Sequence, residues 1–229
     1  MTRRRVSNPL ALAVLSCLIE RPMHPYEIST TLRERGKESS IKLNYGSLYS
    51  VVELLHKHKL IDAQETARAG RRPERTVYAI TEAGRAEFED WLAELLSTPV
   101  KEFTALEAGL SLMPGLPPNE VARLLEQRIE RLRIELRSIE ASHTVARERA
   151  LPELFLVESL YRQAMLRAES DFVTELVRGI RSSSFAGTKT WRRMHELLAD
   201  GVTFDEIFAD PVGHLGEEAR ALLPPDQHK

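Results

Sequence analysis

The feature that most constrains this chain is a change in the spacing of its apolar residues near Leu60. Before that point, apolar residues recur every three or four positions over three successive segments, which is typical of amphipathic helices. After it, two short segments alternate apolar and polar residues, as strands do, and Gly and Pro lie between them. The first third of the chain therefore has the order helix, helix, helix, hairpin.

The ends of the three predicted helices carry residues that start or stop helices. Asn8 followed by Pro9 is a favoured N-terminal pair, and Pro22 ends the first helix. Gly36 is a natural stop after the second helix, and Asn44 is a good N-cap for the third. These signals place the helices at residues 8–21, 25–35 and 45–58. We expect one side of the second helix to hold Tyr26, Ile28 and Leu32, and the buried side of the third to hold Leu48, Val51, Val52 and Leu55.

The two alternating segments are predicted to be the strands of a hairpin. They span residues 60–66 and 75–80, and the second is rich in residues that favour strands. The turn between them, residues 67–73, contains Gly70 and Pro73. This part of the hairpin is strongly basic, with Arg68, Arg71, Arg72 and Arg75.

The remainder of the chain has the spacing of helices. Thr81 is predicted to cap a helix over residues 82–96, and Thr98-Pro99 marks a boundary because proline disfavours helix in the residue before it. Helices are expected at about 102–112, from 119 onward, at 152–180 and at 191–199. The predicted domains are residues 1–98, residues 99–190, and an extension over residues 191–229 whose role the sequence does not indicate.

Two long helices dominate the second predicted domain. The spacing from Val121 to Ile139 is close to a coiled-coil seam, with Val121, Leu125, Ile129, Leu132, Leu136 and Ile139 in register. The second apolar face holds Leu154, Val157, Tyr161, Met165, Ala168, Phe172, Leu176 and Ile180. An intramolecular helical hairpin and a helical dimerisation domain both account for faces of this width.

Charge is unevenly distributed along the chain. Residues 1–80 hold 14 Lys and Arg against 8 Asp and Glu, whereas residues 81–229 hold 18 against 26. The first third is therefore basic and the rest is acidic, although the whole chain has a net charge of −2. This asymmetry indicates that only the first third faces a polyanion.

The order of elements in the first third is that of a winged helix-turn-helix domain. The predicted fold class is therefore mostly α with a small β-hairpin wing, followed by a helical C-terminal domain. In such a domain the third helix enters the major groove, about 12 Å wide, and its N-terminal residues reach the base edges. This architecture favours binding of double-stranded DNA.

Two groups of residues suit DNA in this arrangement. The third helix opens with short polar side chains, and Gly46 lets its backbone approach the duplex closely. The hairpin offers cations for phosphate or for a narrow minor groove. The predicted DNA-binding residues are Lys42, Asn44, Tyr45, Ser47, Tyr49, Ser50, Arg68, Arg71, Arg72 and Arg75.

Four segments of the chain resemble the PadR family of transcriptional regulators. Residues 10–18 look like the family's opening helix, and residues 22–28 look like its second-helix motif. Residues 45–50, Tyr-Gly-Ser-Leu-Tyr-Ser, resemble the family's Gly-Thr-Leu-Tyr signature, and residues 75–85 resemble the motif that follows the wing. The resemblance covers residues 9–96 and by pattern alone extends to the helical C-terminal domain of longer members.

The resemblance implies a function as well as a fold. It implies a homodimer that binds an inverted repeat, usually as a repressor, and some members release DNA when a small aromatic or drug-like molecule binds. Three positions depart from the family pattern: Pro25 and Lys59 stand where Gly is common, and His56 replaces the usual Glu after Leu55. These departures affect the local geometry of the second and third helices.

Other sequence features bear on ligands and on the alternatives. Phe88 and Trp91 lie one turn apart and form either ordinary core contacts or the wall of a pocket for a small aromatic effector. The alternative function is a winged-helix protein-interaction module that contacts an acidic partner without binding an operator. No phosphate loop or nucleophile elbow is present, and His24, His56 and His58 lack zinc-like partners, so we expect no enzyme, cofactor or metal.

The cellular compartment is indicated by cysteine and hydropathy. The single cysteine, Cys17, lies in an apolar run, where a buried thiol in a reducing environment is expected. No apolar run approaches the roughly 18 residues that a transmembrane helix needs. The sequence therefore predicts a cytoplasmic protein.

Overall fold

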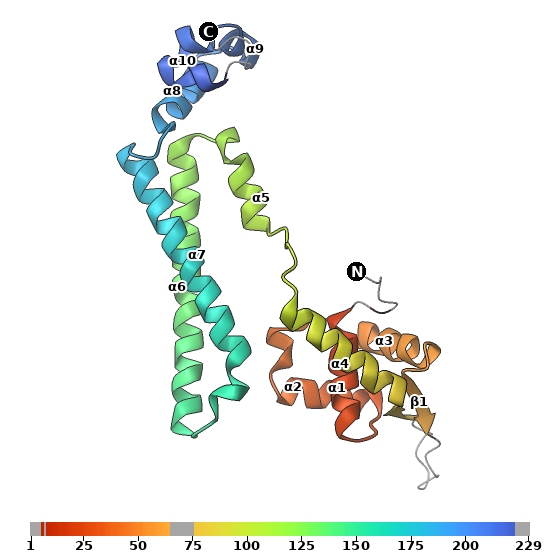
Figure 1. Cartoon of the computed structure of the whole chain (residues 1–229). Helices are drawn as coiled ribbons and strands as arrows, with labels where there is room; N and C mark the ends of the chain where they lie inside the picture. The colour runs from red at the N-terminus through yellow and green to blue at the C-terminus, as the bar shows by residue number, and fades with distance from the viewer. Residues whose placement is uncertain (1–5, 7, 65–75, 223–229) are drawn as a thin grey trace. The chain divides into compact units, whose positions relative to one another are not determined.

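The computed structural model describes residue 6 and residues 8–64 and 76–222 of the chain (Figure 1). It divides into two compact units, Met1–Lys101 and Glu102–Lys229. In the described ranges, every helix is too short or too polar to cross a membrane.

The first unit contains four α-helices and a two-stranded antiparallel sheet within its described residues. In the hairpin, Ile61 pairs with Ile80 and Gln64 pairs with Val77. This is the mostly helical winged-helix arrangement that the sequence predicts. The elements are α1 (Pro9–Glu20), α2 (Pro25–Glu34), a 3-10 turn η1 (Lys37–Ser39), α3 (Tyr45–Lys57), β1 (Ile61–Gln64), β2 (Val77–Ile80) and α4 (Glu82–Ser97).

The helix boundaries in this unit follow their capping residues. The Asn8 side chain accepts a hydrogen bond from the Leu10 N–H, and the Asn44 side chain accepts one from the Ser47 N–H. Thr81 caps α4 by accepting from the Gly84 N–H. Each cap satisfies a helical N–H that would otherwise have no partner, so each start is fixed locally.

The core of the first unit surrounds α1. Leu10, Val14 and Leu15 are fully buried there, and the inner face of α3 contributes Leu48, Val51, Val52 and Leu55, as predicted. Tyr26 differs from its expected neighbours in α2, because it is 52% exposed while Ile28 and Leu32 are buried. A residue two positions before Ile28 points to the opposite side of a helix, which explains the difference.

Close contact between the hairpin and α4 depends on Gly84. A Cβ at this position would lie 2.1 Å from the Leu60 carbonyl oxygen, so a larger residue would force the backbone apart. The Thr81 hydroxyl lies within hydrogen-bond distance of the Lys59 and Leu60 carbonyl oxygens, at 2.9 and 3.0 Å. Together these contacts fix the start of α4 against the end of α3.

All the regular elements in the described residues of the second unit are helices. The long helices α6 and α7 run antiparallel, side by side (Figure 1). Their shared core contains Val121, Leu125 and Ile129 from α6, and Val173, Val177 and Ile180 from α7. The elements are α5 (Ala105–Leu112), η2 (Met113–Gly115), α6 (Pro118–Glu148), η3 (Glu153–Phe155), α7 (Val157–Ser182), α8 (Thr188–Ala199), α9 (Phe204–Ala209), α10 (Pro211–Leu215) and η4 (Glu217–Leu222).

Two rows of ion pairs flank the core between α6 and α7. On one side Arg128 pairs with Glu169 and Glu135 pairs with Arg162, and on the other Glu126 pairs with Arg181 and Glu140 with Arg167. Because oppositely charged residues lie at the same level along the two helices, they favour this alignment of α6 and α7 over alignments shifted along the helix axis. The coiled-coil-like seam of α6 is thus covered within one protomer, as an intramolecular hairpin.

The predicted apolar face over residues 152–180 divides into two parts. The predicted helix starts later, at Val157, because residues 153–155 form the 3-10 turn η3. Leu176 and Ile180 are buried against α6, as expected for a core face. The N-terminal part of the face is more than half exposed at Leu154, Val157, Tyr161, Met165 and Phe172.

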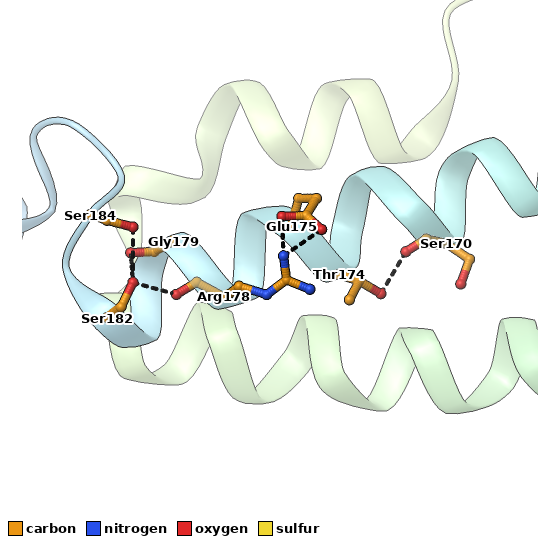
Figure 2. A network of polar contacts seen from close by, with 7 residues as sticks. All are labelled: Ser170, Thr174, Glu175, Arg178, Gly179, Ser182 and Ser184. Carbon is orange, nitrogen blue, oxygen red and sulfur yellow. Dashed lines mark hydrogen bonds and ion pairs between the residues drawn. The ribbon is translucent and has the colours of Figure 1, made fainter.

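Polar side chains in the C-terminal half of α7 make hydrogen bonds within the helix and just beyond it. Figure 2 shows hydroxyl groups from Thr174 and Ser182 that bond back to helix carbonyls, at 2.7 Å to Ser170 and 2.8 Å to Arg178. Ser182 also lies 2.9 Å from the Ser184 hydroxyl. These hydroxyls thus find acceptors one turn back in their own helix, and near its end the Gly179 carbonyl accepts from the Phe185 N–H at 3.1 Å.

The segment from α8 onward has a small core of its own and is joined to η2. Leu197, Ile207, Leu215 and Ala219 form that core. The Trp191 indole N–H donates to the Leu116 carbonyl at 2.8 Å, and a ring nitrogen of His195 lies 2.9 Å from the Pro114 carbonyl oxygen.

Candidate nucleic-acid interface

The N-terminal turn of α3 is the first part of the candidate interface. The Asn44 Oδ1 atom accepts from the Ser47 N–H at 2.7 Å, which holds the turn in shape. Gly46 is exposed, and its backbone is open to close approach. Lys42 is exposed just before the helix. A helix N-terminus with an exposed cation beside it suits a phosphate group.

The outer side of α3 carries the predicted base-reading residues. Tyr49 is 44% exposed, Ser50 is exposed and Ser47 is half-buried. The Ser50 hydroxyl donates to the Gly46 carbonyl at 3.0 Å, so the lone pairs of its oxygen remain to accept a hydrogen bond. Ser50 is therefore suited to the amino groups of adenine or cytosine in the major groove.

Several predicted DNA-binding positions lie outside what the structure describes. Residues 65–75 include Arg68, Arg71, Arg72 and Arg75, and the Tyr45 side chain is likewise not described. The strands that lead into and out of this segment end at Gln64 and begin at Val77. The role of these arginines stays a prediction.

A basic surface at the C-terminal end of α3 lies beyond the DNA-binding residues that the sequence predicts. His56, Lys57 and Lys59 are exposed there. The His56 ring packs edge-on against Tyr78 of β2, with 5.8 Å between ring centroids. The departure at His56 from the family pattern was the available signal, and here it links the recognition helix to the wing.

An ion pair positions α2, the helix that precedes α3. Arg35, at the end of α2, donates to Glu20, at the end of α1, with one of the two bonds at 2.8 Å. This hydrogen bond holds the pKa of the Glu20 carboxyl below its usual range. The pair ties together the ends of the two helices that support α3.

Phe88, Trp91 and Cys17, the candidates for ligand binding or thiol chemistry, lie in or against the core of the first unit. Trp91 is 5% exposed in the first unit's core and Phe88 packs against that core, so a ligand role for them stays a prediction. Burial raises the pKa of the Cys17 thiol to about 11. Among the described residues, no group of three or more His, Cys, Asp and Glu is placed to hold a metal ion.

The fold of this chain is similar to several solved structures. Bacillus subtilis PadR in complex with operator DNA is 18% identical, with a TM-score of 0.56 over 75% of this chain and 99% of that chain. The Vibrio cholerae virulence activator AphA is 16% identical, with a TM-score of 0.55 over 76% and 99%. Bacillus subtilis PadR in complex with p-coumaric acid is 15% identical, with a TM-score of 0.56 over 75% and 97%.

The sequence comparisons concern the first unit. No curated protein matches the chain. Residues 14–90 match the model of the transcriptional regulator PadR-like family, and this segment runs from α1 into α4. Through this winged-helix segment, the chain is similar to the PadR-like family of transcriptional regulators.

Proposed function

We propose that this chain is a sequence-specific repressor that binds an inverted repeat in duplex DNA as a homodimer, and that a small aromatic molecule releases it. Its place of action is the cytoplasm. The basic first third faces the DNA, and the acidic helical remainder holds two such heads at a fixed spacing.

The observation that carries the DNA-binding proposal is the way the first unit presents α3. Leu48 and Leu55 are fully buried on its inner side, whereas Tyr49 and Ser50 are exposed on its outer side. The cap at Asn44 fixes the turn that would reach the base edges first. A rigid helix with a polar outer face meets the requirement for reading a major groove.

The proposed dimer rests on the uncovered apolar face of α7. From Leu154, in η3, to Met165 the exposed members recur at spacings of three and four residues, and Phe172 follows seven residues later. This is the pattern of helices that pack against each other. Apolar surface of this kind is costly in water and marks interaction sites. A second copy of the chain has the matching face, and a two-fold dimer would cover both. The exposed members are Leu154, Val157, Tyr161, Met165 and Phe172.

Two comparisons support the regulatory part of the proposal. The solved Bacillus subtilis PadR is bound to operator DNA in one structure and to p-coumaric acid in another. AphA is a virulence activator, so the sign of regulation is the part to test in a reporter strain. Repression predicts higher reporter output when the gene for this chain is deleted.

DNA binding is tested with a duplex from the promoter region of the chain's own gene. Fluorescence anisotropy of the labelled duplex should show binding at low salt that weakens steeply as salt rises, because phosphate contacts release counterions. Arg71→Ala with Arg72→Ala should weaken binding to every sequence, whereas Ser47→Ala should change the preference among sequences. Absence of binding to this duplex at low salt would instead favour a protein-interaction module.

The proposed aromatic release is tested by adding candidate phenolic acids to the bound duplex. The sequence-derived ligand residues, Phe88 and Trp91, predict a change in Trp91 fluorescence during that titration. Trp191→Phe removes the other tryptophan, so the signal comes from the first unit alone. Release of DNA without any change in Trp91 fluorescence would place the ligand elsewhere.

A further inference from the structure

A groove in the second unit lies between α5, η2 and the first half of α6. Its volume is about 720 Å³, within the usual range for sites that hold small molecules. It lies wholly in the second unit and includes none of the residues assigned to DNA contact. Its lining includes Leu110, Met113, Leu124, Leu125, Leu132 and Arg131.

The walls of this groove are apolar and accessible. Leu112 is 74% exposed, Leu116 is 45% exposed and Leu124 is 40% exposed, and all three line the groove. Exposing leucine side chains to water to this extent is unfavourable, and an apolar ligand that covered them would lower the free energy. The walls therefore suit a hydrocarbon chain or ring.

Of the two arginines in the groove lining, one is available to bind a ligand. Arg128 also lines the groove but pairs with Glu169, and Glu135 pairs with Arg162. Arg131 lies between them on α6 and makes no ion pair within the described part of the chain. A guanidinium beside apolar walls favours an anionic oxygen, which it can bind through two parallel hydrogen bonds.

We propose that this groove is a binding site for an amphiphilic anion, with its apolar part against α5 and α6 and its carboxylate on Arg131. The proposal concerns the second unit alone, and it stands independently of DNA binding. A straight-chain carboxylate such as decanoate is the probe, and decan-1-ol is the matched neutral molecule.

The structure supplies a spectroscopic reporter for this site. The Trp191 indole donates to the carbonyl of Leu116, and Leu116 lines the groove. In the Trp91→Phe variant Trp191 is the single tryptophan, because the chain has two. Decanoate should change its emission, and calorimetry on the unmodified full-length chain checks the same binding without any substitution.

Two variants test the two halves of the site. Arg131→Gln keeps the side-chain stem and removes the charge, and it should weaken decanoate binding about tenfold or more while leaving decan-1-ol binding unchanged. Arg133→Gln is the matched control, because Arg133 pairs with Glu130 and does not line the groove.

Gly109→Leu tests the apolar half. Gly109 lines the groove, and a Cβ added there meets nothing within 4 Å, so the position has room for a larger side chain to start into the groove. It should abolish binding of both probes. Ser111→Leu adds the same side chain to the same helix, at an exposed position outside the lining, and should leave binding intact.

The outcomes separate this proposal from its competitors. Decanoate binding that falls in Arg131→Gln and Gly109→Leu, but not in their controls, supports it. Equal binding in Arg131→Gln and the unmodified chain overturns it. If neither probe binds and Gly109→Leu weakens self-association in sedimentation, the groove is a contact between protomers and the proposal is wrong. Loss of DNA binding in any of these proteins bears on the repressor proposal only.

Discussion

The two units differ in how completely they bury their apolar side chains. In the first unit α1 is enclosed, and Leu10, Leu15 and Ile61 have no exposed surface. In the second unit α7 buries Ile180 at one end and leaves Tyr161 67% exposed nearer the other. The first unit therefore buries its core within one chain, whereas the helical hairpin of the second unit leaves an apolar face exposed.

The largest expected effect comes from the closed core. Leu15→Ala should reduce the free energy of unfolding of the first unit by about 3 kcal/mol, because it leaves a cavity in a packed interior. Urea unfolding followed by Trp91 fluorescence, with Trp191→Phe in every protein compared, measures it. Leu96, 81% exposed in the same unit, is the control: Leu96→Ala should change the value by about 0.5 kcal/mol or less. Equal losses of stability in Leu15→Ala and Leu96→Ala would contradict the contrast between enclosed and exposed apolar side chains.

The next effect concerns the open face. Tyr161→Ser with Phe172→Ser should raise the dimer dissociation constant about 100-fold, because two large apolar contacts are lost. Sedimentation velocity over a concentration series measures it. Phe204 and Phe208 are half exposed on α9, and their change to Ser should leave self-association intact. A monomer at every concentration in the unmodified chain would refute the dimer.

Cys17 gives a pH-dependent test of the enclosed core. Burial raises its pKa from 9.0 to about 11, so above pH 9 the unfolded thiol ionises while the folded thiol does not. This contribution to stability is complete below pH 9 and is lost as the pH rises toward 11, by about 3 kcal/mol at most. Unfolding at several pH values should show that Cys17→Ala lacks this part of the decline. An identical pH profile for both proteins would show that the thiol is open to water.

The cap of the recognition helix should give a smaller effect. Asn44→Ala should cost about 1 kcal/mol of stability, because the Ser47 N–H loses its acceptor. Asn44→Ser keeps a capping oxygen and should lose much less. The comparison is made by thermal unfolding, and DNA affinity of both variants is measured at one salt concentration. If Asn44→Ser binds DNA less well at normal stability, Asn44 contacts the duplex as well as capping α3.

The smallest effect comes from the end of the same helix. Lys59 has a φ of +58°, a left-handed conformation that glycine adopts without strain. Lys59→Gly should therefore stabilise the first unit by about 0.5–1 kcal/mol. Lys57→Gly, inside α3, should destabilise it. A loss of stability in Lys59→Gly would mean that the lysine side chain makes a contact that outweighs the strain.

Prediction from sequence succeeded where local interactions decide the outcome. The start of α3 at Tyr45 follows from Asn44, and the start of α4 at Glu82 follows from Thr81. The sequence pattern puts Tyr26 on the side of Ile28, whereas the two residues point to opposite sides of α2, as a separation of two positions requires. The predicted start of the long helix, at residue 152, is too early, because the 3-10 turn η3 at residues 153–155 leaves no strong sequence signal.

The candidate interface was predictable in part. The exposure of Ser50 follows from the helical period, but the bond that it donates to Gly46 depends on its rotamer. The contact between His56 and Tyr78 joins residues that are far apart along the chain, so no spacing rule indicates it.

The sequence by itself determined the order of the elements, their caps and which side of α3 is polar, because each of these depends on residues within a few positions of one another. Tertiary structure alone decided that the α6 seam is covered by α7, that α7 keeps an open apolar face, and that Arg131 is left without an ion pair among the described residues. Those features depend on which distant side chains come together. The spacing of apolar residues along a helix is the same whichever partner covers them, so the sequence does not identify that partner.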